Sequence, residues 1–502
     1  MGRQQVSANY RGYRTAGIRL SEELLPHLAD RPEALDQIIQ PIHDFDKAHL
    51  VMLVEEKLID RDAGIAMLLA LREMEKRGVE ATRNETGGGI HSGEQYLIRK
   101  LGEDVGGRIH LGRSSGDLDE IGRRMAFRRH LLELFPLLLQ FRQTLLRLAD
   151  EHAETVMPAY THGQNGQTST FGHWLSMWAM VFARDYDRLR SFYERVNVSP
   201  AGAAIMTGSD FPLNRARTAE LLGFSRAIPH TMDAILSHDL ELECGAVLAI
   251  LGSDLGRMGD DLMLWASTEF AMIDVPDRYC VTSSIMMQKK NPAAPQEMKA
   301  LAAESVGAAM LTFVLEKGPT GLPILERRTA ERAFWSVFSS AKQCIGDADD
   351  LISALIVDKE RMRSLAGAFW AQGTDLAGAL VREKNLPWRT AHQIVGILIR
   401  HCVERRIMPF DVDSAMLDEA AVEYMDKPVG LSAQAIRNAL DPVHGVSLRT
   451  LFGGPAPSSA RRELAGFQKQ LESDEEWLRD ARSHLANAAK TLEASIDAIV
   501  KR

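Results

Sequence analysis

The chain has 502 residues, of which 45% are hydrophobic and 25% are charged, a balance typical of globular proteins and unlike that of disordered or collagen-like chains. Its formal net charge is −9 at pH 7, so its electrostatic field repels nucleic acid and anionic membranes, and neither is expected as a partner. A chain longer than about 300 residues exceeds what one hydrophobic core usually serves, which predicts two or three domains.

The four cysteines lie far apart and show no Cys-x-x-Cys or Cys/His spacing, so the sequence predicts no metal site and indicates no organic cofactor. The segment MGRQQVSANYRGYRTAG lacks the apolar core of a signal peptide. Apolar stretches such as Leu131–Leu139 are too short to span a bilayer. We therefore expect a cytoplasmic protein without a membrane role.

From about residue 20 to 105, apolar residues recur at helical spacing, and Gly78 ends one of these patterns. This periodicity predicts a small helical N-terminal domain over residues 1–113. Glycines at 87–89 interrupt the periodicity, so a loop that carries His91 is expected there.

The apolar periodicity is much longer in the middle of the chain. It runs over 118–154, 169–196 and 239–267 and resumes after Pro292, while Pro136 should kink the first segment or end a turn. The third segment has a seam close to that of a coiled coil, formed by Val247, Leu251, Leu255, Met258, Leu262 and Trp265. Long helices with such broad apolar faces predict a central bundle, residues 114–366, shared between subunits; a monomeric helical core is the alternative, because periodicity does not identify the partner.

After about residue 366 the predicted helices shorten and prolines intervene, which predicts a separate C-terminal helical domain over 367–502. Period-two alternation is almost absent, and no internal repeat is found. The predicted fold class is therefore all-α, with three helical domains built around the long bundle.

Three polar loops precede long predicted helices: HLGRSSGD at 110–117, MPAYTHGQNGQTST at 157–170 and YCVTSSIMMQKKNP at 279–292. Helix N-termini present N–H groups and the positive end of the helix dipole, which suits carboxylates. If the fold brings these loops together, they form an anion site. For Ser283 and Ser284 alone, a turn or capping role is the alternative.

The third loop keeps six positions of the pattern Gly-Ser-Ser-x-Met-Pro-x-Lys-x-Asn-Pro: Ser283, Ser284, Met286, Lys289, Asn291 and Pro292. In this it resembles the argininosuccinate lyase branch of the aspartase/fumarase superfamily. The resemblance extends over about residues 85–465 through GRSSGD, MPAYTHGQ, AELLGF, DLAGALVREKNLPWRTAHQIVG and GGPAPS.

That resemblance implies a C–N lyase that releases fumarate from an N-substituted aspartate, a small substrate with two or more carboxylates. It also implies a homotetramer in which each active site takes its three loops from three subunits. By the same resemblance Ser283 is the catalytic base, Lys289 with Asn291 holds the carboxylate that gains charge, and His162 orients the site or helps to protonate the leaving amine. The remaining substrate-binding residues implied are Arg113, Ser114, Ser115, Thr161, Gln164, Ser284, Met286 and Arg328.

The sequence departs from the pattern of this branch in its substrate-facing loops. In the first loop Ser115 and Gly116 replace an Arg and an Asn, and Gln296 replaces the glutamate that usually partners the histidine. Beyond Gly321-Leu322-Pro323 the usual Tyr, Lys and Gln give way to Glu326, Arg328 and Glu331.

These changes predict that the reaction is kept while the specificity differs. The amine product need not be arginine, and N-succinyl amines such as ethylenediamine-disuccinate are candidate substrates, with Arg327 and Arg328 suited to an extra carboxylate. The alternatives are a true argininosuccinate lyase and, from another class, an inactive structural relative like the lens crystallins.

Overall fold

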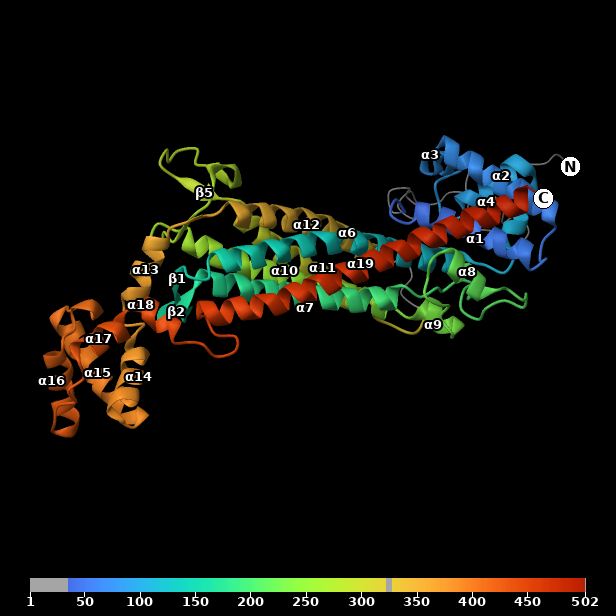
Figure 1. The fold of residues 1–502 in the computed structure, drawn as a ribbon. Helices are drawn as coiled ribbons and strands as arrows, with labels where there is room; N and C mark the ends of the chain where they lie inside the picture. The colour runs from blue at the N-terminus through green and yellow to red at the C-terminus, as the bar shows by residue number, and fades with distance from the viewer. Residues whose placement is uncertain (1–34, 322–326, 502) are drawn as a thin grey trace.

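The structure, a computed structural model, describes residues 35–321 and 327–501. The molecule is elongated, with short helices at one end, long helices through the middle and a small helical domain at the other end (Figure 1). The prediction of a mostly helical chain is confirmed. The strands within the described residues form two-stranded antiparallel sheets, which the sequence pattern did not predict.

The N-terminal end is a cluster of short helices around its own apolar core. That core also includes Ile121 from the first long helix and Ile496 from the last helix of the chain, so the N-terminal helices are joined to the bundle at two places. The elements are α1 Ile39–Glu55, α2 Arg61–Arg77, α3 Val79–Asn84, α4 Ser92–Leu101, α5 Glu103–Gly106 and the 3₁₀ helix η4 Gly107–His110.

The middle of the molecule is a bundle of long helices, and the four predicted apolar segments correspond to α6, α7, α10 and α11. The helix α6 continues through Pro136. The elements are α6 Ser115–Glu151, β1 Val156–Thr161, β2 Gln164–Thr170, α7 Phe171–Val196, α8 Arg215–Leu221, α9 Thr231–Leu236, α10 Asp239–Trp265, β3 Ile273–Asp274, η5 Asp277–Tyr279, β4 Cys280–Thr282, β5 Lys290–Pro292, α11 Ala294–Leu315, α12 Arg327–Ala354 and β6 Ile356–Val357.

The tightest helix pair of the bundle is α10 with α11. The predicted α10 seam, from Val247 to Trp265, is buried. Glycines let the two backbones approach: a Cβ at Gly252 would lie 2.5 Å from Ser305 Oγ, and one at Gly259 would lie 2.6 Å from Pro295 O. Side chains at these positions would therefore force the helices apart.

In the part of the chain that the structure describes, α11 is the one helix long and apolar enough to cross a membrane by length and composition. It corresponds to the predicted bundle helix that follows Pro292. Its contacts with α10 and α12 place it in the helix bundle, and core helices commonly have such a composition.

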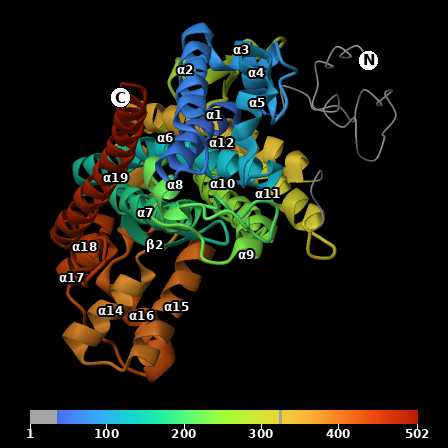
Figure 2. The same cartoon turned by 90° about the vertical axis from the view of Figure 1, so that its right-hand side faces the viewer.

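Two packing units follow residue 358. The small domain has its own core, formed by residues 376–440. Two flanking helices pack elsewhere: Met362 of α13 belongs to the bundle core, and Ala366 of α13 packs with Val446 of α18 and Val156 of β1. The elements are α13 Lys359–Gly367, α14 Gly373–Lys384, α15 Trp388–Arg405, η6 Pro409–Asp411, α16 Ser414–Met425, α17 Ala433–Leu440 and α18 Pro442–Ser447. The last helix, α19 Pro457–Val500, has 44 residues and runs back along α6 and α7 to the N-terminal helices. In the end view α19 and α11 lie on different sides of the bundle (Figure 2). The expectation that helices stay short after residue 366 was therefore wrong for α19, while the predicted domain boundaries remain a prediction.

Candidate active site

The first polar loop ends at the N-terminus of α6. Ser114 is the N-cap residue, and its backbone N–H donates to Asp117 Oδ2 at 3.0 Å. Asp117 is fully buried and also accepts the N–H of Ala204 at 3.1 Å. Burial raises the pKa of Asp117 to about 7, although these backbone N–H groups oppose the shift. Ser114 and Ser115 are half-buried at the start of the helix, where an anion would meet its positive dipole end.

Arg113, predicted to bind substrate, faces inward. Its side chain is 1% exposed, and Nη1 donates to Asp46 Oδ1 at 2.6 Å. Asp46 is also ion-paired with Arg83. Burial by itself would raise the pKa of Asp46, but Arg113 and Arg83 together lower it below the usual value. In this position the Arg113 guanidinium anchors the first polar loop to Asp46 of α1.

Gly116 occupies a position with no room for a side chain. A Cβ built there would lie 2.8 Å from the carbonyl oxygen of Ala204 and 3.3 Å from Ile205 Cα. The backbone at 204–205 thus closes the space into which a residue at position 116 would extend. This close approach is the structural counterpart of the Asn-to-Gly departure seen in the sequence.

The second polar loop is a β-hairpin, β1–β2, with Thr161 paired to Gln164 across its tip. The two turn residues, His162 and Gly163, have φ values of 55° and 71°. Positive φ at both central residues is the signature of the tight hairpin turns that match strand twist. All four tip residues are exposed, so the tip presents Thr161, His162 and Gln164 away from the chain that carries them.

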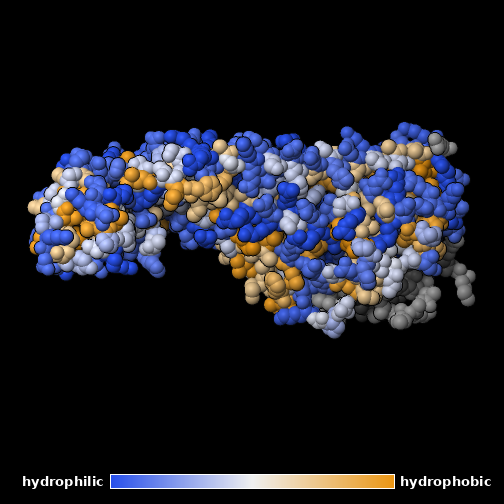
Figure 3. Space-filling view, turned by 60° about the horizontal axis from the view of Figure 1, so that its bottom comes forward, coloured by the Kyte–Doolittle hydropathy of each residue, from blue (hydrophilic) through white to orange (hydrophobic). Residues whose placement is uncertain are grey.

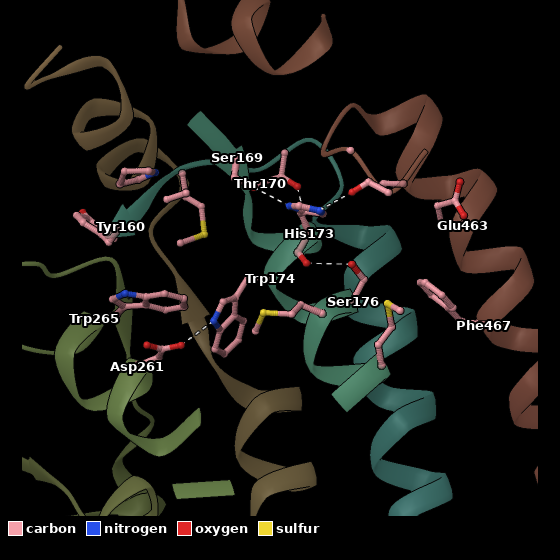
Figure 4. Close-up of a pocket in the computed structure, with 18 of the residues that line it drawn as sticks. Tyr160, Ser169, Thr170, His173, Trp174, Ser176, Asp261, Trp265, Glu463 and Phe467 are labelled. Atoms are coloured by element: carbon pink, nitrogen blue, oxygen red, sulfur yellow. Dashed lines mark hydrogen bonds between the residues drawn. The ribbon is translucent and has the colours of Figure 1, made fainter. Parts of the chain in front are cut away.

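The root of this hairpin is fixed to the bundle beside a cavity of about 600 Å³. The His173 ring bridges Ser169 Oγ and the carbonyl oxygen of Gly453, both at 3.0 Å. Trp174 Nε1 donates to Asp261 Oδ2 at 2.9 Å (Figure 4). The cavity is lined by these groups and by apolar side chains at the root of the hairpin, and the predicted site residues of the described chain do not line it.

The third polar loop is also a hairpin, β4–β5, which stands out from the bundle (Figure 1). Ser283 is half-buried, whereas the rest of its turn, 284–289, is exposed, with Met287 97% exposed. Ser283 Oγ accepts two backbone N–H groups of its own loop, from Met286 at 3.0 Å and from Ile285 at 3.4 Å. Donors in this arrangement stabilise negative charge on the serine oxygen.

Other polar residues of this segment divide between the turn and the start of α11. Lys289 lies at the end of the turn, whereas Lys290 pairs with Asp274 at 2.7 Å at the root of the hairpin. Asn291 is half-buried in β5, and Gln296 lies exposed in the first turn of α11. The side chain of Lys290 is exposed, so its ion pair with Asp274 lies at the surface.

The start of α12 enters a buried ion-pair network that sequence reasoning missed. Arg327 Nη2 donates to Glu241 at 2.7 Å and to Glu120 at 2.9 Å. Arg123 Nε donates to Glu331 at 2.6 Å. Arg327 and Glu331 are therefore packed inside the bundle, where they do not present their charges to a ligand at the surface. The side chain of Arg328 and the whole of Glu326 lie outside the described residues.

The network shifts the pKa values of two of its carboxyl groups in opposite directions. Burial opposes ionisation of Glu120, yet Arg123 and Arg327 lower its pKa to about 2. For Glu331 burial dominates and raises the pKa, although Arg123 opposes the shift. No local motif reveals these contacts, because Glu331 lies 208 positions from Arg123.

One chain does not bring the three polar loops together. The helix α6 has 37 residues, which at 1.5 Å per residue is about 55 Å. Ser114 and Ser115 lie at one end of it, and the hairpin β1–β2 follows its other end, near the hairpin β4–β5 (Figure 1). The two hairpins are therefore a whole bundle length away from the first loop of the same chain.

Comparisons with known proteins match two parts of this chain to family models. A family model described as Lyase matches residues 33–307, and one described as Argininosuccinate lyase C-terminal matches residues 370–447. The chain is 37% identical over 455 residues to an argininosuccinate lyase of Methanoculleus marisnigri, an alignment that covers 89% of this chain and 90% of the relative.

Two solved structures are similar over 94% of this chain and 96% of theirs. One is EDDS lyase in complex with formate, with a TM-score of 0.85 and 29% sequence identity. The other is a variant of EDDS lyase with bound fumarate, with a TM-score of 0.86 and 28% identity.

Proposed function

The chain belongs to the argininosuccinate lyase-like branch of the aspartase/fumarase superfamily, and from this premise we propose that it is a cytoplasmic C–N lyase that releases fumarate from an N-substituted aspartate. The carbon next to one carboxylate loses a proton, and the electron pair moves into that carboxylate to give an aci-carboxylate dianion. This electron pair then returns to form the C=C bond while the C–N bond breaks on the opposite face, and the nitrogen leaves with the electron pair of that bond and gains a proton. The products are fumarate and an amine, and the reverse reaction adds the amine to fumarate.

The observation that carries the proposal is the position of Ser283 in its hairpin. A serine is a weak base unless its alkoxide is stabilised, and here two backbone N–H groups already donate to Oγ. Lys289 and Asn291 follow in the same hairpin, where they are proposed to hold the carboxylate that accepts the charge. Donors preorganised around developing charge usually give the largest catalytic contribution.

The hairpin β1–β2 is proposed to supply the groups on the opposite side of the substrate. Thr161 and Gln164 bind the second carboxylate, and His162 orients the leaving amine or helps to protonate it. Gln296 in α11 replaces the carboxylate expected beside this histidine. An amide can orient an imidazole but does not favour its protonated form, so we assign His162 mainly an orienting role.

The site is proposed to be completed in a homotetramer, because the first loop lies a bundle length from the two hairpins of its own chain. Exposed apolar side chains support this assembly, since α11 presents Val306, Met310, Phe313 and Val314 at its surface. Hydrophobic side chains also gather over the middle of the face drawn in Figure 3. Such patches mark interaction surfaces, and we propose that further copies of the chain cover them.

The specificity is proposed to differ from that of argininosuccinate cleavage. Gly116 offers no side chain and the adjacent backbone closes the space, so the first loop binds its anion through Ser114, Ser115 and the helix N-terminus. Arg327 is engaged inside the bundle, which leaves Arg328 as the residue proposed to bind a further substrate carboxylate. The similarity to EDDS lyase supports an N-succinyl amine substrate. The alternative is argininosuccinate itself, which the 37% identical relative favours.

In the deciding experiment, the purified protein is incubated with fumarate and one amine at a time, and the loss of fumarate absorbance is followed. The amines include arginine, ethylenediamine and other diamines. We expect addition to a diamine and none to arginine. Addition to arginine alone would establish an argininosuccinate lyase instead. No addition to any amine, together with no fumarate release from the corresponding N-succinyl compounds, would favour the inactive structural relative.

The shared site can be tested by mixing two inactive variants, Ser283→Ala and His162→Asn. If these residues reach one site from different chains, hybrid tetramers contain sites in which both are intact, about a quarter of all sites with random mixing. We therefore expect activity to return when the two chains are denatured and refolded together. Mixing the folded variants without denaturation is the control, and failure of the refolded mixture to recover activity would contradict the composite site.

A further inference from the structure

Three side chains outside the polar hairpins bring possible metal ligands together. One nitrogen or oxygen atom from each of His91, Glu94 and His110 lies within 4.8 Å of the other two. Glu94 Oε2 lies 2.9 Å from His110 Nδ1 and 3.5 Å from His91 Nδ1. The cluster is partly shielded, because the side chains of His91 and Glu94 are 8% and 13% exposed, whereas that of His110 is 37% exposed and leaves a path from solvent.

The fold brings these residues together through one glycine. His91 is the N-cap residue of α4 and Glu94 lies in its first turn, while His110 ends η4. A Cβ at Gly106 would lie 2.5 Å from Ile98 N, in the backbone of α4. Only glycine permits this approach, which packs α5 and η4 against α4 and brings His110 next to Glu94.

The spacing of these three ligand atoms fits a shared metal ion. Zinc binds histidine nitrogen and carboxylate oxygen at about 2.0–2.2 Å, so adjacent ligand atoms lie about 3 to 3.5 Å apart. The two distances to Glu94 Oε2 span this range.

The positive charge of Arg113 does not oppose binding of such an ion, because a carboxylate compensates it. The guanidinium of Arg113 is ion-paired with Asp46 at 2.6 Å. Two imidazoles and a carboxylate with open positions form a ligand set typical of divalent transition metals.

We propose that His91, Glu94 and His110 form a binding site for a divalent transition metal ion of the zinc class, with water in its remaining positions. The ion would join the start of α4 to the end of η4. Since His110 lies just before Arg113 and Ser114, a bound ion would fix the stem of the first polar loop. The site is structural or regulatory, because none of its ligands belongs to the proposed elimination chemistry. The sequence alone had predicted no metal site, because its four cysteines show no spacing typical of metal ligands.

The test uses the full-length, tag-free protein after treatment with a chelator and dialysis. Zinc chloride is titrated against it by calorimetry, and cobalt chloride is followed through its visible absorption bands. We expect one saturable ion per chain and a higher melting temperature with zinc. Glu94→Gln and His110→Gln should each weaken zinc binding at least about tenfold and remove the cobalt bands.

The matched control is His401→Gln, which alters a histidine paired with one carboxylate, Glu423, at 2.9 Å. This variant should bind zinc as the unmodified protein does. Circular dichroism and oligomeric state confirm that each variant is folded, and the exposed His110 is the substitution least able to disturb packing. Absence of saturable binding by the unmodified protein, or equal binding by both cluster variants, would overturn the proposal.

Discussion

Replacing Ser283 with alanine is expected to lower kcat by about 10²–10⁴-fold, the usual contribution of a positioned acid or base. The change removes the oxygen that accepts the N–H groups of Ile285 and Met286. Because the turn is exposed, water can satisfy these donors, and neither folding nor assembly should suffer. The value of KM should change much less than kcat, since the proposed carboxylate-binding residues remain.

Steady-state kinetics with the substrate identified in the amine panel measures this effect, and light scattering reports the oligomeric state. Ser447→Ala is the matched control, because the Ser447 hydroxyl donates only locally to the carbonyl oxygen of His444 in α18. It should keep full activity. A fully active Ser283→Ala enzyme would refute the base assignment, even if the protein is a lyase.

Replacing Arg123 with methionine should destabilise the protein by about 3–5 kcal/mol, because it leaves buried carboxylates without a compensating charge. The Arg123 residue is 3% exposed. Its guanidinium lies 2.6 Å from Glu331, 2.5 Å from Glu120 and 3.1 Å from Glu241. Methionine fills much of the same volume, so loss of charge rather than of packing should dominate the change.

Denaturant unfolding of the variant measures this loss at fixed protein concentration. Arg405→Met is the control, since the pair of Arg405 with Glu419 is half exposed and such surface pairs contribute less than about 1 kcal/mol. Adding Glu331→Gln to Arg123→Met removes one of the unpaired charges and should restore part of the stability. A loss no larger than that of the control would show that the network is not stabilised by these charges.

Much of the fold was predictable because it is encoded locally. Helical periodicity depends on neighbouring residues, so the apolar segments identified α6, α7 and α10 with ends within a few residues, and also the start of α11. The same periodicity identified the buried seam of α10. The length of α19 was missed: prolines upstream of it suggested short helices, although none interrupts the helix after its first turn at Pro457.

The sequence by itself indicated the family, because the motif that carries the resemblance, with Ser283, Lys289 and Asn291, is local to one hairpin. It also indicated which loops carry the polar groups. Only the tertiary structure decided that Arg113 faces Asp46, that Gly116 has no room for a side chain and that Arg327 is held inside the bundle. These features depend on partners 67 to 207 positions apart, and no local spacing encodes such pairs. The structure also separated the first loop from the two hairpins, since α6 is a rigid helix whose length keeps its ends apart.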